Sequence, residues 1–561
     1  MSGMQWTVRA LVALGVAASG TSCASPPPAQ PIAPPPWQPM APPPAQPMAA
    51  TPPVDTSIGA LVNHCVNAGL DDRRRSELVR LLAQTRDPRA EPCFIKVLRD
   101  YRMDATEEDV RWAARAIRVL KPKGAAEPLF EVFLKLRASR PGGTMIYRDV
   151  HDALVELPEP AWEGQLIALV NRPIDDRKDF AALKDEMFWQ ITAAELLAIL
   201  KSTHGVKPLI RAILTPNKVE LGNTALNALI RIGKPSIGPA MALLKNEDRE
   251  LAEYSKFEML KAAPPGPDGK APASAQREAE TAHIGTASAI LAAIGREEAT
   301  TPLIEAAAKA NEMTRVLIAR DFVNLPASPA LVKAFRSTYE KTPLSLTAPL
   351  IGSAREALLD RAPYFFDPSL TPWIVKTAMQ AKGDPEDVDA IRVASLASAM
   401  KIMTHDQVPL VDTLHDSKST DLEGHPSFTG KSVAKEYKLC KDLLAACTDN
   451  VGCYLGRLAE PDAHASDTVM TGIKAISMIG ILGTPEVKAK LIELMPRLTN
   501  GDVRGITGVV LDRLFPRGDP TLAAALQKLV DDAEASKEPG RKQTNASFKQ
   551  VIYRLNARAQ Q

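Results

Sequence analysis

The stretch Ala225–Leu244, ALNALIRIGKPSIGPAMALL, contains the pattern that decides the fold. Ala225 is followed by Leu229 four residues later and by Ile232 three residues after that, and a glycine comes next. Spacings of four and three place these side chains on one face of a helix. The small alanine allows a neighbouring helix to approach closely, and the glycine suits a left-handed residue after the helix. Pro239 then opens a second apolar segment, so the stretch predicts a helical hairpin.

This hairpin pattern recurs along most of the chain. The first helix returns as Ala113-Ile117-Leu120, Ala193-Leu197-Leu200, Ala287-Leu291-Ile294-Gly295 and Ala475-Ile479-Leu482-Gly483. The second, opened by a proline, returns at Pro128, Pro208, Pro302, Pro329, Pro372, Pro409, Pro485 and Pro520. Helical hairpins repeating about every 40 residues bury themselves against their neighbours. A chain of 561 residues can then form one stack instead of several separate cores.

Two short motifs carry a family resemblance. Residues 109–114 (DVRWAA) match the Asp-Val-Arg-x-x-Ala start of the first helix of a HEAT repeat, and residues 502–504 (DVR) repeat its beginning. The chain therefore resembles HEAT/armadillo repeat proteins over residues 56–561. The resemblance implies an all-α fold, an α-α superhelix of about twelve helical pairs. Insertions near residues 248–280 and 415–431 interrupt the predicted rhythm.

The end of the chain predicts a cap for this stack. Residues 541–561 place Phe548, Val551, Ile552 and Leu555 on one apolar stripe with basic residues around it. Solenoids require such a helix to cover their last repeat. A helix that lies on a membrane surface is the alternative.

The N-terminus predicts export. Arg9 precedes the short apolar segment Ala10–Ala18, and small residues follow it up to Cys23. Small residues directly before a cysteine resemble a bacterial lipobox, which implies a lipoprotein-type signal peptide over residues 1–22 and acylation of Cys23. Ordinary cleavage after Ala24 is the alternative. With its repeats, the chain is similar to bacterial HEAT-repeat lipoproteins.

A proline-rich segment separates the cysteine from the repeats. Half of residues 26–53 are proline, in an octad that occurs three times. Such a segment lacks the amide donors of helix and sheet, so residues 23–55 predict a disordered tether in the polyproline II form, ~3.1 Å long per residue. We expect a semi-rigid spacer between membrane and repeats; a docking peptide for aromatic grooves is the alternative.

The remaining cysteines suggest disulfides in an oxidising compartment. Cys447 and Cys453 could bridge across a turn, and Cys65 and Cys93 lie on helices close enough in a solenoid to pair. Cys440 precedes Cys447 by seven residues, too far for a bond between them on one helix. Buried free thiols are the alternative.

Composition argues against several classes of function. The formal net charge is +2, from 68 basic and 66 acidic residues that are mixed along the chain, and this favours no nucleic-acid partner. Histidines gather most densely at His405, His415 and His425, with a spacing that fits no metal motif. We therefore predict no metal, no cofactor and no catalytic residue.

These observations predict a non-enzymatic scaffold. A helix stack exposes a long concave surface, on which we expect a protein partner in the cell envelope of a Gram-negative bacterium. The N-terminal anchor would hold the chain at a membrane, with the outer membrane favoured by Ala24 after the cysteine. Two alternatives stay open: a HEAT-like enzyme of the lyase or base-processing type with its site on the concave face, or a purely structural envelope protein.

Overall fold

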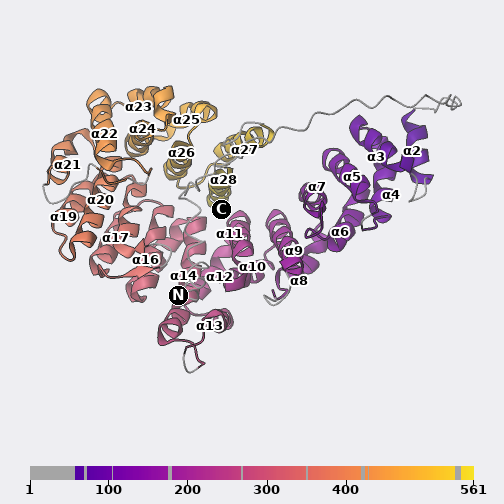
Figure 1. The fold of residues 1–561 in the computed structure, drawn as a ribbon, viewed down its shortest axis with the longest axis horizontal. Helices are drawn as coiled ribbons and strands as arrows, with labels where there is room; N and C mark the ends of the chain where they lie inside the picture. Colours follow the sequence, from indigo (N-terminus) through magenta and orange to yellow (C-terminus); the bar gives the residue numbers. More distant parts are fainter. Residues whose placement is uncertain are drawn as a thin grey trace, which may run out of the picture. The chain divides into compact units, whose positions relative to one another are not determined.

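The chain is all-α in the computed structural model (Figure 1). The structure describes residues 57–67, 73–103, 105–174, 180–266, 269–348, 352–417, 424–426, 429–536 and 545–560. Within these ranges there are 27 α-helices. Extended pairing in the same ranges comprises the two-residue strands β1 (Thr347–Ala348) and β2 (Gly352–Ser353), which are antiparallel, and an isolated bridge between Pro426 and Ser432. The predicted all-α class is confirmed. The predicted signal peptide and tether lie outside the described residues.

Contacts divide the chain after Pro158 into two compact units. The N-terminal unit contains α2 (Ile58–Asn67), α3 (Arg73–Thr85), α4 (Glu91–Arg99), α5 (Glu107–Leu120), α6 (Ala126–Lys135) and α7 (Gly143–Glu156). Helices α3, α5 and α7 pack side by side in one layer, and α2, α4 and α6 form the other.

The C-terminal unit continues the alternation. Its first-helix layer contains α9 (Phe180–Ile199), α11 (Val219–Ile232), α14 (Ala273–Ile294), α16 (Glu312–Asp321), α18 (Ala354–Leu359), α20 (Pro385–Ile402), α22 (Val433–Cys447), α24 (Val469–Leu482), α26 (Gly501–Leu514) and α28 (Asn545–Ala559). Its second-helix layer contains α8 (Glu163–Val170), α10 (Val206–Ile213), α12 (Ile237–Leu244), α15 (Thr300–Lys309), α17 (Pro329–Lys341), α19 (Leu370–Met379), α21 (Val408–His415), α23 (Val451–Leu458), α25 (Lys488–Leu494) and α27 (Pro520–Ala535). Each helix packs against its hairpin partner or a neighbour in its own layer, an arrangement compatible with a helical-repeat solenoid.

The prolines that open the second helices lie deeper in the helix than predicted. In α6, α10, α12, α15 and α19 the proline is the third helical residue; these are Pro128, Pro208, Pro239, Pro302 and Pro372. The prediction of a first position was wrong for these five and right for Pro329 and Pro520. Pro409 is the second residue of α21, and Pro485 begins a 3₁₀ turn before α25. The first turn of any helix has amides without an intrahelical acceptor, so proline costs no hydrogen bond anywhere in that turn.

The glycines that follow the first helices differ in backbone conformation. Gly295, with φ of 72° and ψ of 33°, is left-handed as predicted. Gly233 has a positive φ of 85°, but its ψ of −129° lies outside the left-handed helical region. Gly483 has φ of −73°, so the prediction was wrong there. After α5 and α9, Lys121 and Lys201 adopt positive φ instead, which costs a side-chain-bearing residue some strain.

The DVR motif connects neighbouring first helices. Asp109 lies 3.7 Å from Arg75 Nε of α3 and accepts a hydrogen bond from Ser76 Oγ at 2.5 Å. Arg111 Nε donates to Asp149 Oδ2 of α7 at 3.0 Å. In the second copy of the motif, Arg504 lies over the ring of Phe548 in the following first helix, α28. The acid therefore faces the preceding repeat in the first copy, and the arginine faces the following one in both.

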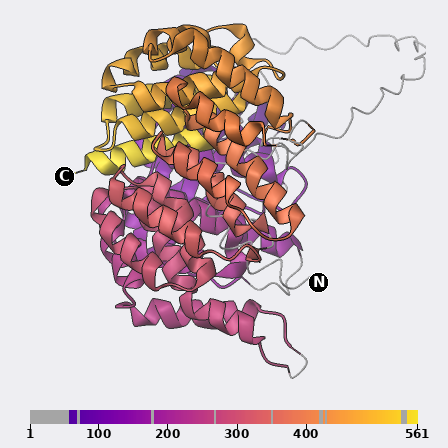
Figure 2. The ribbon, with the colours of Figure 1, turned by 90° about the vertical axis from the view of Figure 1, so that its left-hand side faces the viewer.

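The C-terminal helix closes the C-terminal unit into a circuit. Besides α26 and α27, α28 packs against α11 and α14, more than 250 residues earlier (Figures 1 and 2). Gln550 Nε2 donates to Asn227 Oδ1 of α11 at 3.1 Å, and Arg296 Nη1 donates to the Gln560 carbonyl at 2.6 Å. The side-chain oxygen of Gln560 accepts from the amide of Lys234 at 2.9 Å. The predicted cap thus covers the last hairpin and also joins it to the early repeats.

The insertion near residues 248–280 contains an extra helix. Helix α13 (Arg249–Ala262) packs against α14, and a small apolar cluster of Met259, Ala279 and Ala282 lies between them. This pair projects beyond the neighbouring helices in Figure 2. Phe257 of α13 is 63% exposed.

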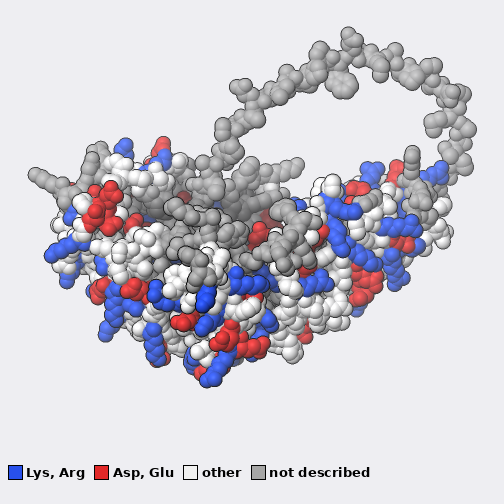
Figure 3. Space-filling model, turned by 60° about the horizontal axis from the view of Figure 1, so that its bottom comes forward, with Lys and Arg blue, Asp and Glu red and all other residues white. Residues whose placement is uncertain are grey.

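The surface carries charges of both signs. On the face drawn in Figure 3, basic and acidic side chains are intermixed. None of the described helices combines the length and apolar character that crossing a bilayer requires.

Candidate functional site

The predicted cysteine pairs are bonded in the structure. Cys65 of α2 is joined to Cys93 of α4, and Cys447 at the end of α22 is joined to Cys453 of α23. Cys440 is a buried free thiol, whose pKa burial raises to about 12. It therefore stays protonated and unreactive near neutral pH. The predicted lipidation site, Cys23, lies outside the described residues.

The histidine-rich region does not form a cluster. His405 lies in a 3₁₀ turn before α21, while His415, at the end of that helix, has Nδ1 2.9 Å from Asp416 Oδ1. In the part of the chain that the structure covers, no group of three or more His, Cys, Asp or Glu side chains is arranged to hold a metal ion.

Two arginines of α28 join this helix to the turn that follows α16. Arg558 of α28 is 3% exposed; it pairs with Asp512 at 3.1 Å and donates to the Asn324 carbonyl at 2.9 Å. Arg554 Nη1 donates to Asn324 Oδ1 at 3.1 Å. Because cations at helix C-termini satisfy carbonyls and the negative end of the helix dipole, these contacts stabilise the closed circuit.

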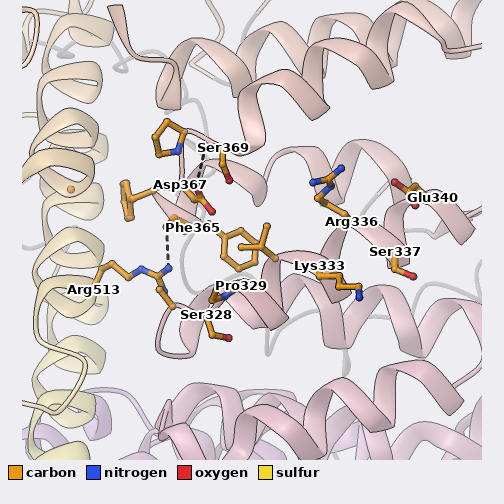
Figure 4. Close-up of a pocket in the computed structure, with 15 residues that line it drawn as sticks. Ser328, Pro329, Lys333, Arg336, Ser337, Glu340, Phe365, Asp367, Ser369 and Arg513 are labelled. Atoms are coloured by element: carbon orange, nitrogen blue, oxygen red, sulfur yellow. Dashed lines mark hydrogen bonds between the residues drawn. The ribbon is translucent and has the colours of Figure 1, made fainter. Parts of the chain in front are cut away.

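The structure contains a pocket of about 830 Å³ (Figure 4). Its lining comes from one face along α17 and the two residues before it, the turn between α18 and α19, and single residues of α24 and α26. The residues are Ala327, Ser328, Pro329, Val332, Lys333, Arg336, Ser337, Glu340, Phe365, Phe366, Asp367, Pro368, Ser369, Gly480 and Arg513. The volume is within the roughly 300–1,000 Å³ that ligand sites occupy.

Local sequence explains why these elements meet at the pocket. Ser328 caps α17 by accepting a hydrogen bond from the amide of Leu331, and Pro329 begins the helix. Phe366 has φ of 48°, which reverses the chain between α18 and α19. Gly480 provides room, since a Cβ there would approach the ring of Phe366 to 2.9 Å. The pocket therefore depends on a bare backbone position in α24.

Arg513 is fixed at one side of the pocket. Its two terminal nitrogens donate to the carbonyls of Leu325 and Phe365, each at 3.0 Å. Burial lowers the pKa of Arg513 to about 10, although Asp512 opposes the shift. The guanidinium stays charged at neutral pH and is only partly compensated by protein groups.

Lys333 and Arg336 of α17 supply positive charge at the opposite side, and both are exposed. Arg336 lies over the ring of Trp373 at 5.7 Å. Of the two acids in the lining, Asp367 accepts a hydrogen bond from the Ser369 amide at 2.9 Å, and Glu340 is exposed at the edge. The lining thus contains three cations and two acids.

No sequence pattern predicts this pocket. Its lining residues lie up to 186 positions apart, from Ala327 to Arg513, and each has an ordinary local role in a cap, a turn or a helix. Among the described residues that line it there is neither His nor Cys, so the histidine and cysteine patterns gave no signal. No protein-family model matches this chain, and comparison with curated proteins finds no significant relative.

Proposed function

We propose that this chain is an exported, lipid-anchored scaffold of the HEAT/armadillo type that binds a protein partner in the bacterial cell envelope. The observation that carries the binding role is the 830 Å³ pocket with cations on both sides. A pocket of that size, on helices tied together by buried polar contacts, is preorganised and so loses little entropy when it binds.

The repeat type is supported by the way the DVR motifs act. Asp109 and Arg111 reach the neighbouring first helices on both sides, and Arg504 reaches the next one. A motif that bonds to the neighbouring units on each side is useful only in a stack of equivalent hairpins.

Export is supported by the two disulfides, because such bonds persist in oxidising compartments and are rare in the cytosol. The signal-like segment before Cys23 and the proline-rich segment after it are consistent with a periplasm-facing or surface lipoprotein, and we favour the outer membrane.

The binding role is tested by site-specific crosslinking in the native envelope. A photoreactive amino acid replaces Ser337 inside the pocket or, as control, the exposed Thr521 of α27. We expect one stoichiometric partner from position 337 and none from position 521. The same background from both positions would remove the case for a scaffold.

The anchor is tested separately by mass spectrometry of the mature N-terminus. We expect an acylated Cys23 as the first residue. A retained Met1 would contradict export.

A further inference from the structure

The pocket is positively charged at two places with carbon-rich surface between them. Figure 4 shows Arg513 on one side, Lys333 and Arg336 on the other, and Phe365 between them. The other apolar residues of the lining are Ala327, Pro329, Val332, Phe366, Pro368 and Gly480. A ligand that fits must present negative charge at both ends and an apolar group at its centre.

The positive charges have few protein partners that a ligand would have to displace. Within the described residues neither Lys333 nor Arg336 forms an ion pair, and Arg336 lies over the face of Trp373. Asp367 accepts a hydrogen bond from the amide of Ser369, the residue before α19. The carbonyls of Leu325 and Phe365 hold the terminal nitrogens of Arg513 and orient its guanidinium, and Asp512 and Asp367 are the acids near it.

We infer that this pocket binds an extended acidic segment of a partner protein. One carboxylate pairs with Arg513, a second pairs with Lys333 and Arg336, and an apolar side chain between them packs against Phe365 and Phe366. This inference rests on the proposed scaffold function and names the chemistry of its partner.

The test is peptide binding to the full chain, measured by fluorescence anisotropy. The probe carries acidic residues on both sides of a phenylalanine; a peptide with lysines in place of the acids is the control. We expect saturable binding of the acidic peptide alone, weakening as salt is added. Equal binding of both peptides, or preferential binding to phosphatidylglycerol vesicles, would overturn the inference.

Variants localise the binding. The double variant Lys333→Glu/Arg336→Glu should reduce affinity at least about tenfold, since two attractive charges become repulsive. Lys528→Glu is the matched control, an exposed lysine within α27. Lys333→Ala, a milder change, should reduce affinity by about threefold and covers the case in which the double variant fails to fold. Arg513 is left unchanged because it holds two turns together.

The crosslinking experiment separates the two proposals. If Lys333→Glu/Arg336→Glu still captures the same partner through position 337, the acidic-segment inference is wrong and the scaffold function stands. If the unsubstituted chain captures no partner at all, the scaffold function itself fails. Loss of capture in the double variant, with capture retained in Lys528→Glu, supports both.

Discussion

The two units of this chain build the same hairpin and stabilise it differently. In the N-terminal unit, ion pairs join each first helix to the next one: the buried Arg75 of α3 lies beside Asp109 of α5, and the partly exposed Arg115 of α5 pairs with Asp149 of α7. In the C-terminal unit, the last helix returns to α11 and inserts the buried Arg558 among helix ends. In an open row, each hairpin is stabilised only by the hairpins next to it. In a closed circuit, hairpins far apart in the sequence also stabilise one another through the contacts of α28.

Substitution of Arg558 should lower the stability of its unit the most. Arg558→Met leaves Asp512 and the Asn324 carbonyl buried without their partner, so we expect the free energy of unfolding of the C-terminal unit to fall by about 3–5 kcal/mol. Hydrogen exchange followed by mass spectrometry should show faster exchange in α11, α26 and α28 together, with α3 to α7 unchanged. Exchange confined to α28 would mean that the circuit is not a cooperative unit.

Removal of the disulfides should have the next largest effect, and each bond should affect the stability of its own unit. The Cys65–Cys93 bond closes 28 residues and the Cys447–Cys453 bond closes 6. Loop entropy then predicts losses of about 3.5 kcal/mol for Cys65→Ser/Cys93→Ser and about 2 kcal/mol for Cys447→Ser/Cys453→Ser. Each is measured by urea denaturation with exchange as the local readout. Equal losses in both units from either variant would contradict the division of the chain.

Between about pH 7 and 8, the stability of the C-terminal unit should change with pH. Lys474 is buried and donates to the carbonyls of Lys401 and Met403, and burial lowers its pKa to about 7. The unfolded chain keeps this proton up to about pH 10, so it binds more protons than the folded chain above pH 7, and stability rises with pH. Between about pH 7 and 8 we expect a gain of about 1 kcal/mol that Lys474→Met abolishes.

The control for this effect lies in the same unit. Burial also lowers the pKa of Lys218, to about 8, so a further rise in stability above that pH should persist in Lys474→Met. Urea midpoints measured across this pH range give both slopes. A slope below pH 8 that the substitution leaves unchanged would mean that Lys474 does not titrate there.

The exposed ion pairs should contribute least. Arg118 and Asp152 are 51% and 29% exposed, so we expect Arg118→Ala to change the unfolding free energy of the N-terminal unit by less than about 1 kcal/mol. Salt should remove even this difference. A loss comparable to that of Arg558→Met would mean that the two units are stabilised in the same way.

Most helices were predictable because their signals are local. The apolar spacing starting at Ala225 and the proline at 239 predict α11 and α12 without any knowledge of their neighbours. The exact place of the prolines was wrong by two residues, since a whole first turn tolerates proline and the sequence does not say where the turn begins. The two cysteine pairs were among the alternatives because stacked hairpins bring adjacent helices together.

The closing of the circuit and the pocket were not predictable. The stripe of Phe548 and Leu555 indicates a buried helix face, but any apolar surface could cover it. Each hairpin is rotated slightly relative to the one before it, and these rotations add up until α28 reaches α11. The sequence of one hairpin does not reveal the total rotation. The pocket depends on the same total rotation, because its cations come from α17 and α26, which are far apart in the sequence.

The sequence by itself determined the helical class, the hairpin period and the buried faces, because periodicity and turn chemistry act over a few residues. The tertiary structure alone decided that the C-terminal repeats close on themselves and that Arg513 lies across a pocket from Lys333 and Arg336. Those contacts join residues more than 170 positions apart, and they depend on how every intervening helix packs.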